Sequence, residues 1–214
     1  MNGKSLKPAG VWLAGLFVCL LVVSGTTGAT SVRQLSLEEL LEGAELVFEG
    51  RVVDIVTHSL EAGSKGEGGR VYTTVTFEIL DLVKGEYAQP TLTLSFLGGS
   101  ADSRSLVVEE MRLPAAGERG IYFVESLVRR QVHPLYGWSQ GHFLVVSDPD
   151  LGERVMTADS QSITGVQPAP AKRPNKLSKG VVKGLVLESA AALSHALTAE
   201  QFKRTLRDML QQAD

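Results

Sequence analysis

Hydrophobic and polar residues alternate over several stretches of the chain, as they do in half-buried β-strands. The first strong pattern of this kind is Glu45–Val56. The apolar residues on one of its faces are Leu46, Phe48 and Val52. Glu49 and Arg51 occupy the other face, which we expect to be solvated. After Val52 the alternation of apolar and polar residues shifts by one position, and such a shift within one strand predicts a β-bulge near Val52–Val53.

Similar alternation predicts further strands downstream. They lie at Arg70–Val83, Thr91–Leu97, Ile121–Val124, Gly141–Ser147 and, as a short one, Arg154–Thr157. The second of the two long strands also changes parity, around Asp81. Long strands with such switches are typical of a strongly coiled sheet that closes on itself. The sequence therefore predicts a mainly β domain at residues 30–160, with five to six strands in a barrel.

Two helices are expected to flank this barrel. Ser36 and Glu39 have the spacing of a capping box, which predicts a short helix directly before the first strand. Thr198 and Gln201 form a second capping box ahead of a C-terminal amphipathic helix. Its apolar stripe is Ala199, Phe202, Leu206, Met209 and Leu210, with Lys203, Arg204, Arg207 and Asp208 off the stripe. Residues 161–184 are rich in proline and lysine and predict a linker, which leaves residues 185–214 as a C-terminal helical segment.

Residues 1–29 have the composition of a signal peptide. Lys4 and Lys7 precede an apolar run of 13 residues, Val11–Val23, which is short for a membrane span. Small residues up to Ala29 suit signal peptidase. We therefore expect cleavage after Ala29 and a secreted or periplasmic protein with no stable membrane span. Retention of the run as an anchor and acylation of Cys19, the only cysteine, are the alternatives.

The net charge of the chain and the spacing of its histidines limit the partners and sites that can be expected. The net charge is −3, and removal of Lys4 and Lys7 leaves 19 basic against 24 acidic residues, a net charge of −5. This balance argues against nucleic acid as a partner. The four histidines are His58, His133, His142 and His195. Their spacing matches no metal-binding motif, so we predict no metal, no cofactor and no catalytic residues.

Aromatic, amide and imidazole side chains suit ligand contacts, and several are expected on the barrel face and its loops. The candidate binding surface is Tyr72, Tyr136, Trp138, Gln140 and His142. Two loops predicted at Gly98–Ser105 and Tyr136–His142 belong with it. The alternative interpretation of the second loop is a simple turn that leads into the next strand.

One block of the chain resembles a known group of proteins. Its parts are Ala44–Val53 (AELVFEGRVV), Val71–Thr73, Val83–Gly85, Gly98–Gly99, Gly117–Glu118 and Gln140–Phe143. Over about half of the chain, these motifs resemble those of uncharacterised secreted bacterial proteins related to the netrin/TIMP-like OB-fold superfamily. The resemblance implies an OB-like barrel, flanked by helices, that acts as a binding or inhibitory module.

The combined expectation is an exported, non-catalytic β-barrel module that binds another secreted or periplasmic protein. The first alternative is an inhibitor or chaperone of a co-secreted (metallo)protease. TIMP inhibitors, however, chelate the zinc of their target with an N-terminal cysteine, and the chain after residue 29 contains none. The second alternative is a small hydrolase that uses Ser139 with His133 or Ser147 with His142. No nucleophile elbow surrounds either serine.

Overall fold

The computed structural model describes residues 33–60, 70–101, 104–108, 111–129, 131–168 and 180–213. The predicted signal peptide with Cys19 lies outside these residues, as does the part of the predicted linker at 169–179. The described residues belong to one compact unit, Val32–Asp214.

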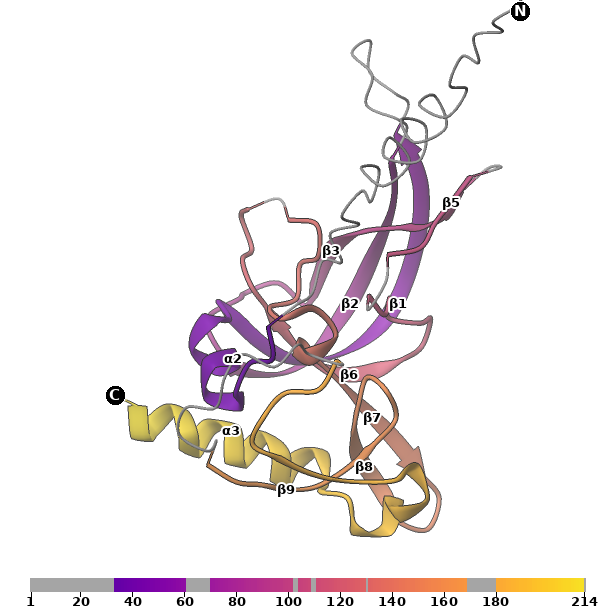
Figure 1. Cartoon of the computed structure of the whole chain (residues 1–214). Helices are drawn as coiled ribbons and strands as arrows, with labels where there is room; N and C mark the ends of the chain where they lie inside the picture. The colour runs from indigo at the N-terminus through magenta and orange to yellow at the C-terminus, as the bar shows by residue number, and fades with distance from the viewer. Residues whose placement is uncertain are drawn as a thin grey trace, which may run out of the picture. The chain divides into compact units, whose positions relative to one another are not determined.

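A single large antiparallel sheet dominates the described residues (Figure 1). Its eight strands are β1 (Leu46–Leu60), β2 (Arg70–Lys84), β3 (Thr91–Leu97), β6 (Arg119–Val124), β7 (His142–Asp148), β8 (Gly152–Thr157), β9 (Ser162–Val166) and β10 (Leu185–Glu188). Their order is β10-β9-β8-β7-β6-β1-β2-β3. A separate hairpin consists of β4 (Gly99–Ala101) and β5 (Arg104–Leu106). The helices are α2 (Leu37–Gly43), η2 (Trp138–Gly141), η3 (Ala190–His195) and α3 (Ala199–Ala213).

The mainly β fold is as predicted, but the sheet does not close into a barrel. In the part of the chain that the structure describes, β3 and β10 are its two edges and do not pair with each other. The sheet also extends beyond residue 160 through β9 and β10, where the sequence predicts a linker and a helical segment. Each of these strands has five residues or fewer, too few for alternation to be read as a pattern.

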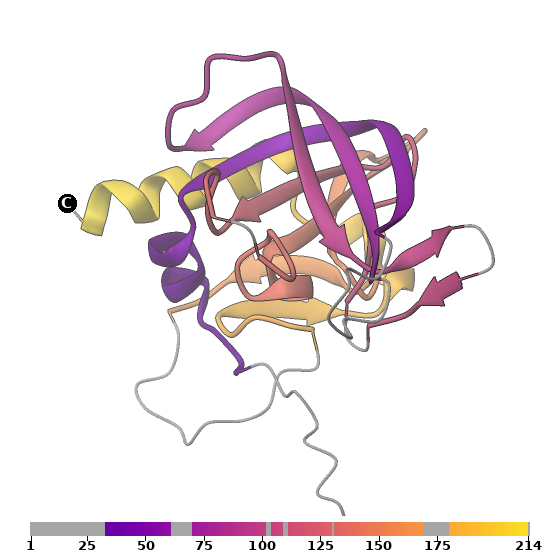
Figure 2. The ribbon, with the colours of Figure 1, turned by 90° about the horizontal axis from the view of Figure 1, so that it is seen from above.

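Two separate cores replace the single interior of a barrel. Alternate residues of β6 enter different cores, because this central strand is buried on both faces. Ile121 and Phe123 pack in the core that contains α2, α3 and β7–β9. Tyr122 and Val124 pack in the other core, under the strongly curved β1, β2 and β3 (Figure 2). The curvature that suggested a barrel is therefore confined to one end of the sheet.

The predicted bulge in β1 is confirmed. The register between β1 and β2 shifts between Val52 and Asp54, and also at two places nearer the start of β1. Gly50 lies at one of these shifts, and a Cβ atom there would come within 2.6 Å of the Phe48 ring. Glycine therefore allows the close approach that the bend requires.

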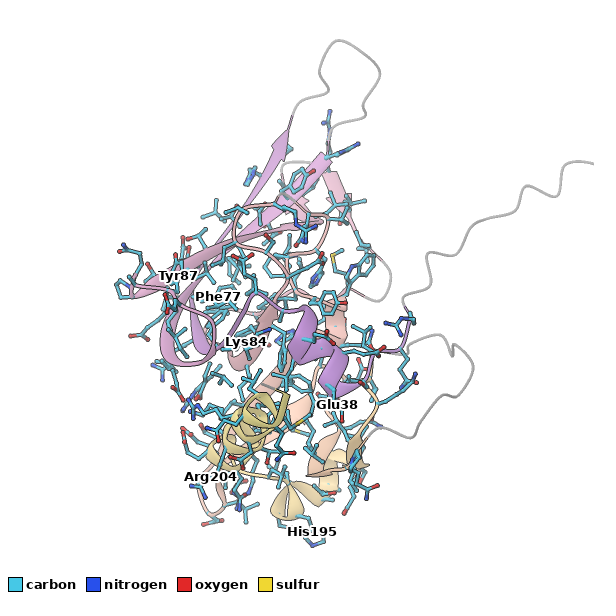
Figure 3. The ribbon with its side chains drawn as sticks, turned by 90° about the vertical axis from the view of Figure 1, so that its left-hand side faces the viewer. Glu38, Phe77, Lys84, Tyr87, His195 and Arg204 are labelled. Atoms are coloured by element: carbon cyan, nitrogen blue, oxygen red, sulfur yellow. The ribbon has the colours of Figure 1, made fainter. Side chains whose placement is uncertain are left out.

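Helix α2 is held at both ends. The predicted capping box is present: the Glu39 amide donates to the Ser36 hydroxyl at 3.1 Å, and the Ser36 amide donates to the Glu39 carboxylate at 2.7 Å. At the other end, Nζ of Lys84 donates to the carbonyl oxygens of Leu41 at 2.6 Å and Ala44 at 2.7 Å (Figure 3). Lys84 thus satisfies carbonyls that the helix itself leaves unpaired and places a cation at their negative end.

Two smaller expectations also need correction. The loop predicted at Gly98–Ser105 is instead the hairpin of β4 and β5, whose three-residue strands are too short to predict. Helix α3 is present with its predicted apolar stripe, yet Lys203, assigned to the polar side, is only 2% exposed. Glu49, expected on a solvated face, is 1% exposed. The two buried charges compensate each other, as described below.

Candidate functional site

The five residues of the predicted binding surface do not form one surface. Gln140 is 1% exposed and serves a structural purpose. Its side-chain oxygen accepts from the Leu35 amide at 2.8 Å, and its nitrogen donates to the Arg33 carbonyl at 3.1 Å. These bonds tie the segment before α2 to η2. The side chain is consumed by internal hydrogen bonds and is not presented to a ligand.

Tyr136 and Trp138 are also engaged in packing. The Tyr136 ring lies against Gly43, where a Cβ atom would collide with it. The Trp138 ring stacks on His133 at a centroid distance of 5.9 Å. His133 in turn meets Phe96 edge-on at 5.1 Å. Tyr136 and Trp138 are both half-buried, so their role is to close the end of a core.

His142 belongs to a buried polar cluster with Glu118 and Arg112. Its Nε2 lies 2.8 Å from a Glu118 oxygen, and Arg112 donates to the other Glu118 oxygen at 2.6 Å. Burial lowers the pKa of His142 below its ordinary value, against the opposing effect of Glu118. Burial alone would raise the pKa of Glu118, but His142 and Arg112 hold it below its usual range. The cluster is therefore a neutral imidazole beside a carboxylate–guanidinium pair.

One of the two candidate serine–histidine pairs is too far apart for catalysis. Ser147 lies five residues from His142 on the same strand, which separates them by about 16 Å. Ser139 accepts a hydrogen bond from the Arg112 amide at 3.4 Å. The Nδ1 atom of His133 accepts from the Leu135 amide at 3.1 Å. One nitrogen of each ring is therefore held by another group, Nε2 of His142 by Glu118 and Nδ1 of His133 by the Leu135 amide.

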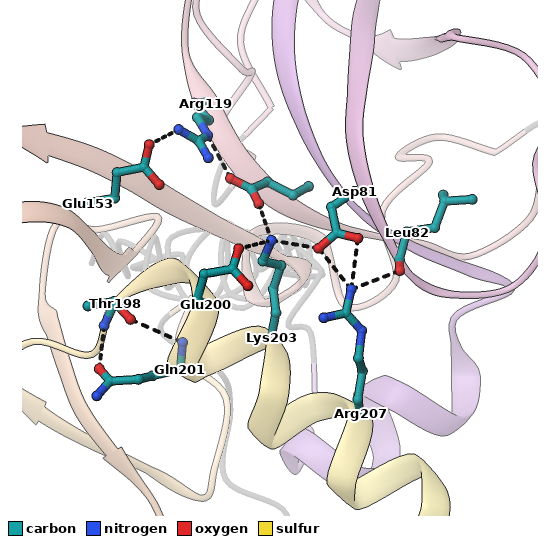
Figure 4. A network of polar contacts seen from close by, with 10 residues as sticks. Asp81, Leu82, Arg119, Glu153, Thr198, Glu200, Gln201, Lys203 and Arg207 are labelled. Carbon is teal, nitrogen blue, oxygen red and sulfur yellow. Dashed lines mark hydrogen bonds and ion pairs between the residues drawn. The ribbon is translucent and has the colours of Figure 1, made fainter.

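A network of charges that sequence reasoning missed joins α3 to the sheet (Figure 4). Nζ of Lys203 lies 2.7 Å from Glu49, 2.6 Å from Asp81 and 2.6 Å from Glu200. Burial alone would lower the pKa of Lys203, but the hydrogen bonds to these carboxylates raise it above its ordinary value. Arg119 contacts both Glu49 and Glu153.

The same three carboxylates have oxygens close enough together to hold a metal ion. The Lys203 ammonium, however, lies among them at hydrogen-bonding distance and supplies the positive charge itself. The burial of Lys203 could have been recognised from the sequence. Lys203 stands four residues after Ala199 and three before Leu206, a spacing that places it on the buried face of α3.

Tyr72 lies elsewhere, at a cavity of about 540 Å³ between β3 and the segment Ser126–Pro134. In Figure 1 this segment rises beside β3, and the Leu97 amide donates to the Val132 carbonyl at 3.0 Å. The Tyr72 ring stacks on His58 at 6.4 Å. The volume is within the range of ligand sites in proteins, which is about 300–1,000 Å³.

The backbone of β3 faces this cavity. In an antiparallel ladder, alternate residues bond to the partner strand and the residues between them point away. The bonds from Ile79 to Pro90 and from Gly98 to Val71 set the phase, so Leu92, Leu94 and Phe96 bond to β2. Thr93 and Ser95, which line the cavity, then point away from β2. Other described residues supply no partner for their outward amides and carbonyls.

No protein-family model, curated protein or solved structure matches this chain. None of the helices in the described ranges is both long and apolar enough to cross a membrane. The motif residues behind the netrin/TIMP-like resemblance have structural roles here: Lys84 caps α2, Gln140 anchors the segment before it, and His142 is buried. The arrangement best suited to a partner is the outward edge of β3 and the cavity beside it.

Proposed function

We propose that this protein is an exported, non-catalytic module that binds an extended segment of another protein along the free edge of β3. One observation carries the proposal. The outward backbone groups of Thr93 and Ser95 open into a cavity of about 540 Å³ and have no partner among the described residues. A strand added there would satisfy them.

The geometry supports strand addition in a second way. The Leu97 amide bonds to the Val132 carbonyl on the outer edge of β3, and the described residues do not continue this ladder to Ser95 or Thr93. A partner strand in the cavity beside β3 can continue the ladder past Ser95 and Thr93. Backbone hydrogen bonds would provide the affinity, and the side chains that line the cavity would provide selectivity.

Export is proposed from the N-terminal pattern of two lysines, an apolar run of 13 residues and small residues up to Ala29. The partner would then be a secreted or periplasmic protein. The netrin/TIMP-like resemblance supports a binding or inhibitory role and keeps a co-secreted (metallo)protease among the candidate partners. The hydrolase alternative has less support, because Ser147 and His142 lie too far apart for catalysis and no nucleophile elbow surrounds either candidate serine.

A displayed library of random linear peptides provides the probe, since the partner is unidentified. We expect peptides selected on the purified protein to slow hydrogen exchange at the Thr93 and Ser95 amides, as measured by NMR. Ser95→Pro removes the outward donor and leaves the ladder with β2 intact, because the Ser95 amide points away from β2. It should abolish binding, whereas Ser95→Ala, which keeps the backbone donor, should not.

Circular dichroism and thermal melts of both variants check that they are folded. If Ser95→Pro unfolds the protein, Thr93→Pro is the replacement, because its amide also points outward. Selection of no peptide, or equal binding by the alanine variant and a folded proline variant, would refute strand addition at β3.

A further inference from the structure

We infer that the segment bound at β3 is acidic: its side chains carry carboxylates that meet the basic residues around the cavity. This inference rests on the proposed strand addition. Three of the residues that line the cavity are His58, Arg70 and Arg129. None of the described lining residues is aspartate or glutamate. Such a concentration of basic groups is notable in a chain whose net charge is −3.

The basic residues come from both sides of the space that the added strand would occupy. His58 and Arg70 stand near the ends of β1 and β2 that meet in the hairpin, and His58 is the register partner of Tyr72. Arg129 lies on the opposite wall, in the segment Ser126–Pro134. A strand between the two walls alternates its side chains, so carboxylates on either face can approach a cation.

Arg129 can exchange its present partner at little cost. It pairs with Glu125 at 3.2 Å, four residues earlier, and its side chain is 67% exposed. Exposed pairs of this type contribute little to the stability of a protein. A carboxylate of the incoming strand would bind in a less exposed position, beside Tyr72 and Leu94, where the lower local dielectric strengthens the attraction.

Gln131 indicates that the ligand is a peptide and not merely an anion. Both polar atoms of its side-chain amide are buried without a partner among the described residues, and Gln131 lines the cavity. An amide has both donor and acceptor atoms, which match the carbonyl and amide of one peptide unit. Rotation of the side chain toward the bound strand would satisfy both.

Nucleic acid fits these residues less well. Single-stranded nucleic acid is usually bound by several aromatic side chains on which successive bases stack. Among the described lining residues, Tyr72 and His58 are the ring-bearing side chains other than Pro134, and these two already stack on each other.

Three synthetic peptides test the inference: blocked repeats of Glu-Thr, Gln-Thr and Lys-Thr of equal length. We expect the Glu-Thr peptide to bind about tenfold tighter than the Gln-Thr peptide and the Lys-Thr peptide to bind weakest, by titration calorimetry. The preference should decrease with salt. Arg70→Gln with Arg129→Gln should remove the preference and leave the affinity for Gln-Thr unchanged. Arg204→Gln, on α3 outside the cavity, is the matched control and should bind like the wild type.

The outcomes separate the two proposals. Equal affinity for Glu-Thr and Gln-Thr, with both lost in Ser95→Pro, would overturn the acidic preference and leave strand addition standing. Tight Glu-Thr binding that survives in a folded Ser95→Pro variant would overturn strand addition and, with it, this inference. Competition by a single-stranded oligonucleotide at equal affinity, with the same dependence on Arg70 and Arg129, would assign the cavity to nucleic acid and refute an acidic peptide.

Discussion

His133 gives the sharpest test of the structure, because it is buried as a neutral ring. It is 2% exposed, its Nδ1 accepts from the Leu135 amide, and its Nε2 has no partner among the described residues. Burial lowers the pKa of His133 from its ordinary value of 6.5 to about 3. Protonation of Nδ1 would also place two N–H groups face to face. The perturbation we propose is His133→Phe, which keeps an aromatic ring and removes the titration.

The folded-state pKa lies below the unfolded value, so the unfolded chain binds the proton first. Stability linked to His133 is therefore complete above pH 6.5 and declines as the pH falls toward 3. Each pH unit in that window is worth about 1.4 kcal/mol, so the wild type should lose about 2.5 kcal/mol between pH 6.5 and pH 4.5 from this group. At neutral pH, His133→Phe leaves the Leu135 amide without an acceptor, which costs about 1–2 kcal/mol.

The two stability curves should therefore cross at about pH 5–6. Urea titrations of both proteins from neutral pH down to pH 4.5 measure this. Carboxylates begin to titrate at the acidic end, since 4.5 is the ordinary pKa of glutamate, but both proteins carry the same carboxylates and their contribution cancels in the comparison. His195→Phe is the control, because His195 lies exposed on η3 (Figure 3) and should follow the wild type. Parallel curves for wild type and His133→Phe would show that the ring is not buried as a neutral group, and the assigned packing around Trp138 would be wrong.

Three further substitutions test the contacts that hold the fold. Lys203→Met leaves Glu49 buried without its ammonium partner and should lower the free energy of unfolding by about 3–5 kcal/mol. The control is Arg204→Met at the exposed neighbouring position, which should lower it by about 0.5 kcal/mol or less. Lys84→Met removes the donors to the α2 carbonyls and should cost about 2 kcal/mol, with loss of hydrogen-exchange protection confined to α2 if the cap is correctly assigned. Phe48→Asp places a charge in the core beside Phe77 and Tyr122 and should cost about 3 kcal/mol or more; a wild-type melting temperature would contradict its assigned inward face.

Features that depend on neighbouring residues could be predicted from the sequence. The capping box at Ser36 needs only Glu39, three positions later, and the bulge at Val52–Val53 is visible as a change of parity. The inward face of β1 and the apolar stripe of α3 follow from periodicity for the same reason. Each of these is a local consequence of side-chain size and polarity.

Features that depend on residues far apart in the chain could not be predicted from the sequence. The burial of Lys203 is favourable only because Asp81, 122 residues away, and Glu49 meet it in the folded protein. Sheet closure likewise depends on which strands become edges, and short strands such as β10 carry no pattern of their own. Gln140 and His142 were predicted to contact a ligand, but both make internal hydrogen bonds. Amide and imidazole side chains serve either purpose equally well, and only the fold distinguishes the two uses.

The open edge of β3 also bears on how the protein behaves when its concentration rises. The outward-facing side chains along this edge are Thr91, Thr93 and Ser95, which carry no charge, and no proline interrupts the strand. Lysine or proline at such positions is a common safeguard against edge-to-edge aggregation. A strand that remains open to a partner is equally open to a second copy of itself. The same proline that we expect to block a partner should therefore make the protein more soluble, so that binding capacity and resistance to aggregation change in opposite directions at one residue.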